Sequence, residues 1–129
     1  MTRFFSTTGA SFALLGVITR ALSSHALKPS LEELGKLENF NIASDYSLIH
    51  GIAMIAVAIL CHIFPDGKFP LAGWALLAGS ILFQGTVFLK CFITLGATGI
   101  LTPIGGAFLM AGWLMLICFS LGIKRPAAG

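Results

Sequence analysis

Two long stretches without a charged residue restrict the fold of this chain more than any other feature. Residues 69–89 form one charge-free stretch of 21 residues, and residues 100–123 form another of 24. An α-helix needs about 20 apolar residues to cross the roughly 30 Å hydrocarbon core of a bilayer. Only 10% of the 129 residues are charged and 57% are hydrophobic, whereas a soluble domain has roughly 25% charged residues. A soluble chain this short has too little interior for so much apolar surface, so we expect a membrane protein.

Four apolar segments are long enough to span a bilayer. The sequence therefore predicts an all-α, four-helix transmembrane bundle that forms a single domain over residues 1–129. The expected spans cover residues 3–22, 46–64, 69–92 and 99–123. The first span is the weakest, because serine, threonine and glycine dilute it, and on its own it also resembles a signal peptide. The connections after the second and third spans are short, so spans two, three and four should run antiparallel to their neighbours.

A polar segment over residues 23–45 separates the first two spans. Ser30 followed by Glu33 matches a helix capping box, and leucines recur behind it at helical spacing. We expect a short amphipathic helix over residues 30–39 that lies at the membrane surface.

The basic residues lie near the ends of apolar segments, which is typical of membrane helices. The net charge of +3 and the pI of about 9.0 therefore do not indicate a nucleic-acid partner. Each side of the membrane receives four basic residues: Arg3, Lys68, Lys124 and Arg125 on the side of the termini, and Arg20, Lys28, Lys36 and Lys90 on the other. The count is a tie. We favour cytoplasmic termini because Lys124 and Arg125 follow the last span directly, whereas the opposite segment mixes its lysines with acidic residues.

Small residues four positions apart occur within three of the spans: Gly9 and Ala13, Ala75 and Gly79, and Ala107 and Ala111. Such pairs allow two helix backbones to approach closely, because lipid supplies no hydrophobic force between helices. They favour a compact bundle, and they favour self-association equally well.

A group of polar residues is expected at one membrane boundary. His25 follows the first span, and Asp45, Tyr46 and His50 stand at the start of the second, where Tyr46 and His50 share a helix face. Two interpretations are open. The group either relays protons or holds a ligand, or it is a hydrogen-bonded clasp that pins the polar segment to the bundle, and we favour the clasp. Haem or metal ligation by His25 and His50 lacks a further clustered ligand, so no metal and no cofactor is expected.

Three other polar residues need a partner or a shallow position. Arg20 lies about one turn from the end of the first span, so its guanidinium can reach the interface. Gln84 lies deep in the third span and must bond across the bundle. Thr102, another polar residue expected to bond between helices, precedes a proline at the start of the fourth span. No nucleophile and base pair or phosphate-binding loop is present, so we expect no catalytic residues and no enzyme.

Several short motifs, in order, resemble a known family. They are HALK at residues 25–28, Tyr46 with His50, AGW at 72–74, LTPIGG at 101–106 and AGW at 111–113. Over residues 16–121 the chain resembles the small membrane proteins of domain-of-unknown-function family 423, which has bacterial members and a mitochondrial relative. The resemblance implies a four-span inner-membrane protein, in a bacterial cytoplasmic (inner) membrane in preference to a mitochondrial one, and brings no assigned activity with it. His25, Tyr46, His50, Thr102, Pro103, Gly105 and Gly106 match the family pattern.

The chain departs from the family pattern at one end. Ser23 and Ser24 replace the usual glycine and alanine, Arg20 replaces a small residue, and Asp45 stands where a basic residue often precedes the tyrosine. These changes suggest an Arg20–Asp45 pair that is specific to this chain.

The leading functional hypothesis is a structural or accessory bundle in the lipid bilayer that forms a homo-oligomer or docks on a larger membrane complex. The alternative is a protein that binds or conducts a proton, a lipid or a small ligand through His25, Tyr46 and His50.

Overall fold

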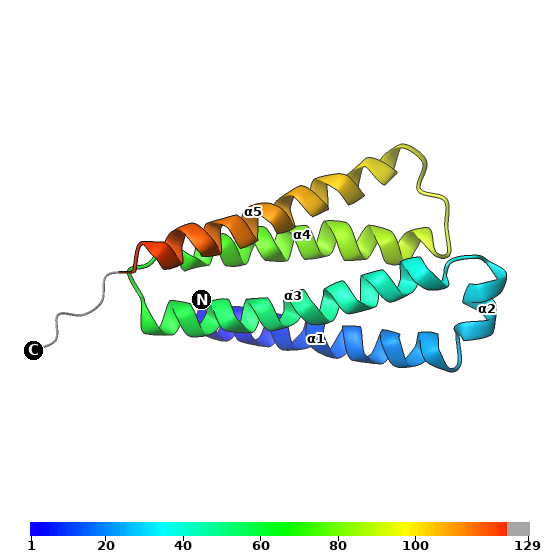
Figure 1. Ribbon diagram of the computed structural model, residues 1–129, viewed down its shortest axis with the longest axis horizontal. Helices are drawn as coiled ribbons and strands as arrows, with labels where there is room; N and C mark the ends of the chain where they lie inside the picture. The colour runs from blue at the N-terminus through cyan, green and yellow to red at the C-terminus, as the bar shows by residue number, and fades with distance from the viewer. Residues whose placement is uncertain (124–129) are drawn as a thin grey trace, which may run out of the picture.

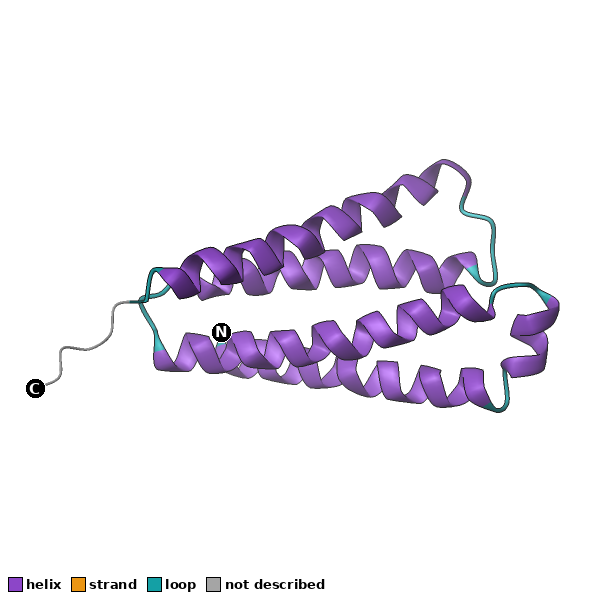
Figure 2. Ribbon diagram, viewed as in Figure 1, coloured by secondary structure: helices purple, strands orange, loops and turns teal. Residues whose placement is uncertain are grey.

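The computed structural model describes residues 1–123, and the regular structure in this part of the chain is entirely helical (Figures 1 and 2). Lys124 and Arg125, on which the predicted orientation depends, lie outside the described residues. Four segments are long and apolar enough to cross a membrane, as predicted. The helices are α1 (Thr2–Ser24), α2 (Lys28–Glu33), α3 (Leu37–Ile63), α4 (Phe69–Lys90), the 3₁₀-helix η1 (Gly96–Ile100) and α5 (Leu101–Leu121).

The long helices form two closely packed pairs. Helix α1 packs along α3 and α5 packs along α4, while contacts between α3 and α4 join the pairs. Figure 1 shows the α1–α3 pair below and the α4–α5 pair above, with α5 diverging from α3 toward the end that carries α2. Helices α3 and α4 are therefore the inner helices of the bundle, and α1 and α5 leave most of their surface uncovered.

Glycines bring the backbones together inside each pair. A Cβ atom on Gly51 of α3 would lie 2.5 Å from the backbone nitrogen of Ala13 and 2.6 Å from the carbonyl oxygen of Gly9. This confirms that Gly9 and Ala13 form a close-contact surface. In the other pair, a Cβ on Gly79 of α4 would lie 2.7 Å from the backbone nitrogen of Leu109.

The expected pair of Ala107 and Ala111 does not contribute to the α4–α5 contact in the same way. Ala107 is exposed, and the buried positions of α5 are instead Gly105, Leu109 and Gly112. A Cβ on Gly112 would meet the side chain of Leu76 at 2.7 Å. The face of α5 that packs is thus the one with glycines seven residues apart.

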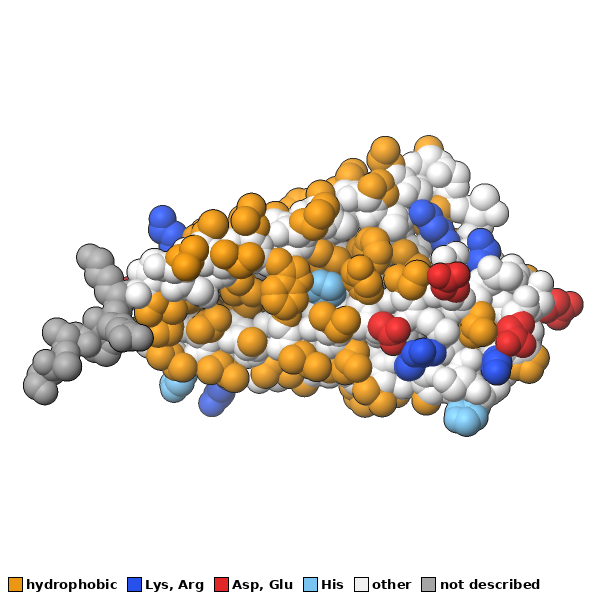
Figure 3. Space-filling model, viewed as in Figure 1, with side chains coloured by type: hydrophobic (Ala, Val, Ile, Leu, Met, Phe, Trp, Pro, Cys, Tyr) orange, Lys and Arg blue, Asp and Glu red, His pale blue; other side chains and the backbone are white. Residues whose placement is uncertain are grey.

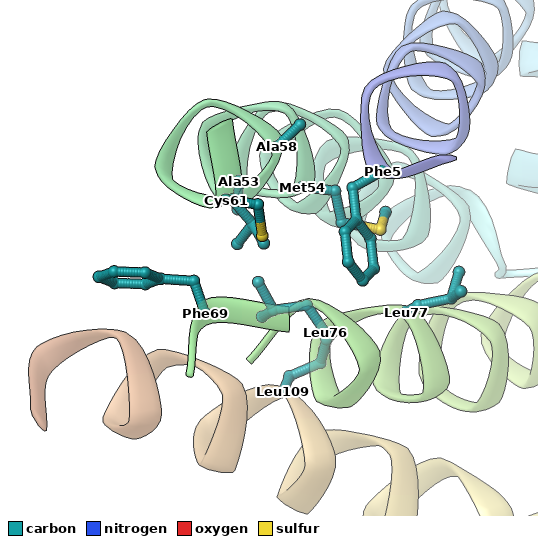
Figure 4. Packing of buried hydrophobic residues seen from close by; sticks show 10 residues of the cluster. Phe5, Ala53, Met54, Ala58, Cys61, Phe69, Leu76, Leu77 and Leu109 are labelled. Carbon is teal, nitrogen blue, oxygen red and sulfur yellow. The ribbon is translucent and has the colours of Figure 1, made fainter. Parts of the chain in front are cut away.

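The main core lies where the two pairs meet, near the first residues of α1. Phe5 of α1, Met54 of α3 and Leu76 of α4 are fully buried there, and Figure 4 shows their side chains converging between the helices. The Phe5 ring lies over Gly73 of α4, because a Cβ at that position would be 2.6 Å from Phe5 Cζ. Phe5 therefore anchors α1 to the second pair as well as to α3.

The helix between the first two spans differs from the prediction. It covers Lys28–Glu33 rather than residues 30–39, and Ser30 lies inside it without a capping bond. Pro29 suits the first helical turn, which sets the earlier start. Gly35 adopts φ +63°, and the N–H of Lys36 donates to the carbonyl oxygen of Leu31 at 2.8 Å, a Schellman ending.

Because α2 ends at Glu33, the second span starts earlier than predicted. Helix α3 begins at Leu37 instead of Tyr46, so the polar residues before Tyr46 belong to the long helix. Figure 3 shows hydrophobic side chains over the long helices, with acidic and basic side chains gathered mostly at the end that carries α2. The N-terminus of α1 lies at the opposite end, where the Phe4 and Trp74 rings are 5.1 Å apart.

Candidate functional site

His50 is the centre of the polar contacts between the helices. It lies 13 residues after the start of α3, which corresponds to a depth of about 20 Å along the helix, and it is only 4% exposed. Its Nδ1 atom lies 2.8 Å from the carbonyl oxygen of Tyr46, one turn earlier. Its Nε2 atom lies 3.2 Å from the indole Nε1 of Trp113, on α5. His50 therefore ties α3 to α5.

These two partners determine where the imidazole proton lies. An indole N–H can only donate, so Nε2 of His50 must be the unprotonated, accepting nitrogen. A backbone carbonyl can only accept, so Nδ1 carries the proton and donates to Tyr46. His50 is thus the neutral Nδ1–H tautomer, with both ring nitrogens bonded to the protein.

Gln84 of α4 meets this imidazole from a third helix. Its Nε2 lies 3.5 Å from Nδ1 of His50, and its Oε1 has no partner within the described residues. Because Nδ1 carries a proton, an amide NH₂ cannot donate to it. In the opposite amide orientation, Oε1 faces Nδ1–H as a second, more distant acceptor beside the carbonyl oxygen of Tyr46. The sequence predicted a partner for Gln84 across the bundle, and that partner is His50.

A groove runs beside this cluster between α3 and α5. It measures about 500 Å³, and its walls are largely apolar. The centroid of the Tyr46 ring lies 5.4 Å from that of His50 and 5.0 Å from that of Phe83, with the rings tilted relative to each other. The residues that line the groove with His50 include Tyr46, Ile49, Phe83, Leu109, Met110 and Trp113. The groove gives a bilayer-soluble molecule access to the side of the cluster.

His25 is not part of this cluster, and the predicted grouping of His25 with Tyr46 and His50 is wrong. Ser23 Oγ bonds Asn41 Oδ1 at 2.6 Å, which places the end of α1 level with the first turns of α3. His50 lies nine residues farther along α3. The physical reason is the early start of α3, which carries His50 well inside the span while His25 stays exposed at the end of α1.

Arg20 and Asp45 form the pair that the departures from the family pattern suggested. Arg20 Nε lies 3.1 Å from Asp45 Oδ1, and the two side chains are 47% and 52% exposed. Exposed ion pairs contribute about 0–1 kcal/mol to stability. This pair and His25 line a small surface hollow that is separate from His50.

Thr102 bonds between helices as expected. Its hydroxyl lies 2.7 Å from the hydroxyl of Thr86, so α5 and α4 are linked within the first turn of α5. The sequence did not predict Thr86 as the partner of Thr102 or Trp113 as the partner of His50. The only signal for Trp113 was its position near the middle of a span, which suits packing better than an interfacial belt. Among the described residues, no three acidic, cysteine or histidine side chains gather as a metal site would require.

Together, the four long apolar helices and the hydrogen bonds among them define a small α-helical integral membrane protein. Comparison of the sequence with known families gives a specific result. The profile of the family described as "Protein of unknown function (DUF423)" matches residues 19–106, and the chain belongs to this family.

Several curated relatives cover almost the whole chain. A UPF0382 membrane protein of Staphylococcus aureus is 30% identical over 115 residues, which is 89% of this chain and 93% of the relative. The UPF0382 membrane protein YwdK of Bacillus subtilis is 28% identical over 116 residues, covering 89% and 94%. One from the yeast Schizosaccharomyces pombe is 33% identical over 109 residues, covering 81% and 90%. No solved structure is significantly similar to the chain.

Removing the indole donor tests the link between α3 and α5. We expect Trp113→Phe to lower the free energy of unfolding by about 1 kcal/mol, because it removes one interhelical hydrogen bond but keeps an aromatic ring. Trp74→Phe is the matched control, since no hydrogen bond from the Trp74 indole occurs within the described residues. Thermal unfolding in detergent gives the stability of both variants. If Trp74→Phe and Trp113→Phe lost equal stability, the Trp113 hydrogen bond would have no specific role.

Proposed function

We propose that this protein is a structural or accessory membrane bundle that assembles with itself or docks on a larger membrane complex, and that it is not an enzyme. The observation that carries the proposal is the exposure of α5. This helix packs on α4 through Gly105, Leu109 and Gly112, and only 17% of its most apolar stretch is buried. A membrane helix with so little of its surface covered by its own chain has most of that surface available to lipid or to another protein.

Two polar contacts inside the spans support the same proposal. Both ring nitrogens of His50 are occupied by Tyr46 and Trp113, so the imidazole has no free nitrogen for acid–base chemistry. The Thr86–Thr102 bond also has its partners within the bundle. Such closed polar contacts hold helices in one arrangement, which suits a scaffold.

Assembly can be tested with a thiol that the chain already carries. Cys118 on α5 is exposed, whereas Cys61 and Cys91 are buried. Oxidative cross-linking in native membranes should give a dimer that the Cys118→Ala variant abolishes, if α5 faces a second copy. Affinity purification in mild detergent with mass spectrometry should identify a larger complex, if α5 faces other proteins. A single chain without cross-links and without co-purifying protein would contradict the proposal.

For location, we propose a bacterial cytoplasmic membrane with both ends of the chain in the cytoplasm. Four spans place the two ends of the spanning region on one side. The basic residues number four on each side, so the preference rests on Lys124 and Arg125, which follow the last span directly. Fluorescence of a green fluorescent protein fused after residue 129 would support this topology, and activity of a fused alkaline phosphatase would contradict it.

The groove favours one alternative function. A lipid or small apolar ligand could occupy the space beside Tyr46 and His50, without any part for His25. Gly106 also lines this groove, so Gly106→Val would narrow it. Native mass spectrometry of the protein extracted from cells would support the alternative if it found an adduct of constant mass that this variant loses.

A further inference from the structure

A second hollow, away from His50, lies at the membrane boundary on the end that carries α2. It measures about 680 Å³ and lies between the start of α3 and the segment that joins α4 to α5. Lys36 and Asn39 line one side, and Lys90 and residues 91–96 line the other. Because α4 ends at Lys90 and α3 begins at Leu37, this hollow lies at the ends of two spanning helices.

The two lysines of this hollow are not neutralised by the protein. The ion pairs within the described residues are Arg20–Asp45 and Lys28–Glu32, and neither includes Lys36 or Lys90. Both lysines are partly buried. The only hydrogen bond of the Lys90 side chain in this part of the chain is a long one, 3.5 Å from Nζ to the carbonyl oxygen of Gly99. A partly desolvated ammonium group without a counter-charge favours the binding of an anion.

The charge of Lys36 acts on the interior of this hollow. Cys91 lies just beyond the end of α4, is buried and lines the hollow. Burial raises the pKa of the Cys91 thiol, and the positive charge of Lys36 lowers this pKa by a smaller amount. The positive charge of Lys36 therefore acts on the wall of the hollow at Cys91.

Uncharged donors complete the polar side of the hollow. Asn39 has an amide group on its rim, and the backbone N–H groups of Thr94, Leu95 and Gly96 have no acceptor within the described residues. No aspartate or glutamate lines the hollow. Its remaining walls are apolar, from Leu34, Phe92, Ile93 and Leu95. A ligand that matches these walls has an anionic group with several acceptor oxygens and a hydrocarbon part attached to it.

We propose that this hollow binds the phosphate group of an anionic phospholipid. Lys36 and Lys90 contact the phosphate oxygens from opposite sides, and the backbone N–H groups of residues 94–96 donate to the same group. The apolar walls contact the glycerol and the first carbons of the acyl chains. A free phosphate ion offers the same oxygens but leaves the apolar walls unused, which favours the lipid as the source.

The test is a titration of the purified full-length protein in detergent with phosphatidylglycerol, followed by native mass spectrometry. We expect Lys36→Gln and Lys90→Gln each to weaken phosphatidylglycerol binding by about tenfold or more, since each removes a charge-assisted hydrogen bond. Lys28→Gln is the matched control, because it removes one positive charge at the same end from a residue paired with Glu32. It should change the affinity by less than about twofold, as expected for an exposed pair.

Other outcomes would overturn the proposal. If Lys28→Gln weakened phosphatidylglycerol binding as much as Lys36→Gln and Lys90→Gln do, the lipid would be attracted to the positive surface in general and not to this hollow. Binding of diacylglycerol, which lacks the phosphate, as tightly as phosphatidylglycerol would exclude a phosphate site. Inorganic phosphate that displaces the lipid at equal concentration would identify a soluble phosphate as the ligand. Melting temperatures within a few degrees of the parent confirm that each variant is folded.

Discussion

Gly51→Leu is expected to separate α1 from α3 and to leave little folded protein in detergent. The new side chain would start 2.5 Å from the backbone nitrogen of Ala13 and 2.6 Å from the carbonyl oxygen of Gly9. Both obstacles are backbone atoms, so no rotamer change can relieve the clash. Overpacking commonly lowers the free energy of unfolding by about 1–3 kcal/mol. We expect Gly51→Leu to lower it by about 3 kcal/mol or more.

Gly85→Leu is the matched control for this change. Gly85 also lies within a span, but a Cβ atom there meets no other atom within 4 Å. The control should keep or slightly raise the melting temperature, because leucine favours a helix by roughly 0.5–1 kcal/mol over glycine. Thermal unfolding followed by tryptophan fluorescence gives both values. If the two variants melt at the same temperature, the close approach of α1 and α3 is not a major source of stability.

Gly105→Val is expected to detach α5 from α4. A Cβ atom on Gly105 would overlap the backbone nitrogen of Phe83 and lie 2.8 Å from the carbonyl carbon of Leu82. Moving α5 outward would also stretch the Thr86–Thr102 hydrogen bond. We expect the free energy of unfolding to fall again by about 3 kcal/mol. A larger fraction of the variant molecules than of the parent should lack a docked α5.

The neighbouring glycine supplies the control for α5. A Cβ on Gly106 would approach only the Phe83 ring, at 3.7 Å, which is ordinary van der Waals contact. Gly106→Val should therefore stay folded, although it inserts the same side chain one position away. Limited proteolysis and thermal unfolding should distinguish the two variants. A Gly105→Val protein as stable as Gly106→Val would rule out tight backbone packing between α4 and α5.

The candidate site was only partly predictable. The sequence indicated that Gln84 and Thr102 bond across the bundle, because a polar side chain within a span needs a partner. The departures from the family pattern suggested the pair of Arg20 and Asp45. It identified neither Trp113 nor Thr86, since a hydrogen bond between two helices depends on how each helix is rotated about its axis. The grouping of His25 with His50 failed for a local reason, the glycine turn at Gly35 that starts α3 nine residues early.

The sequence by itself determined that this chain has four membrane-spanning helices and which residues can lie in lipid. That follows from length and apolarity, because backbone groups in a bilayer must be satisfied within each helix. Tertiary structure alone decided which helices pair and which polar groups meet. Lipid does not drive apolar helices together, so the arrangement depends on close contacts at particular glycines such as Gly51 and Gly105. Those contacts place Trp113 on His50 and leave Lys36 and Lys90 facing a hollow at the membrane boundary.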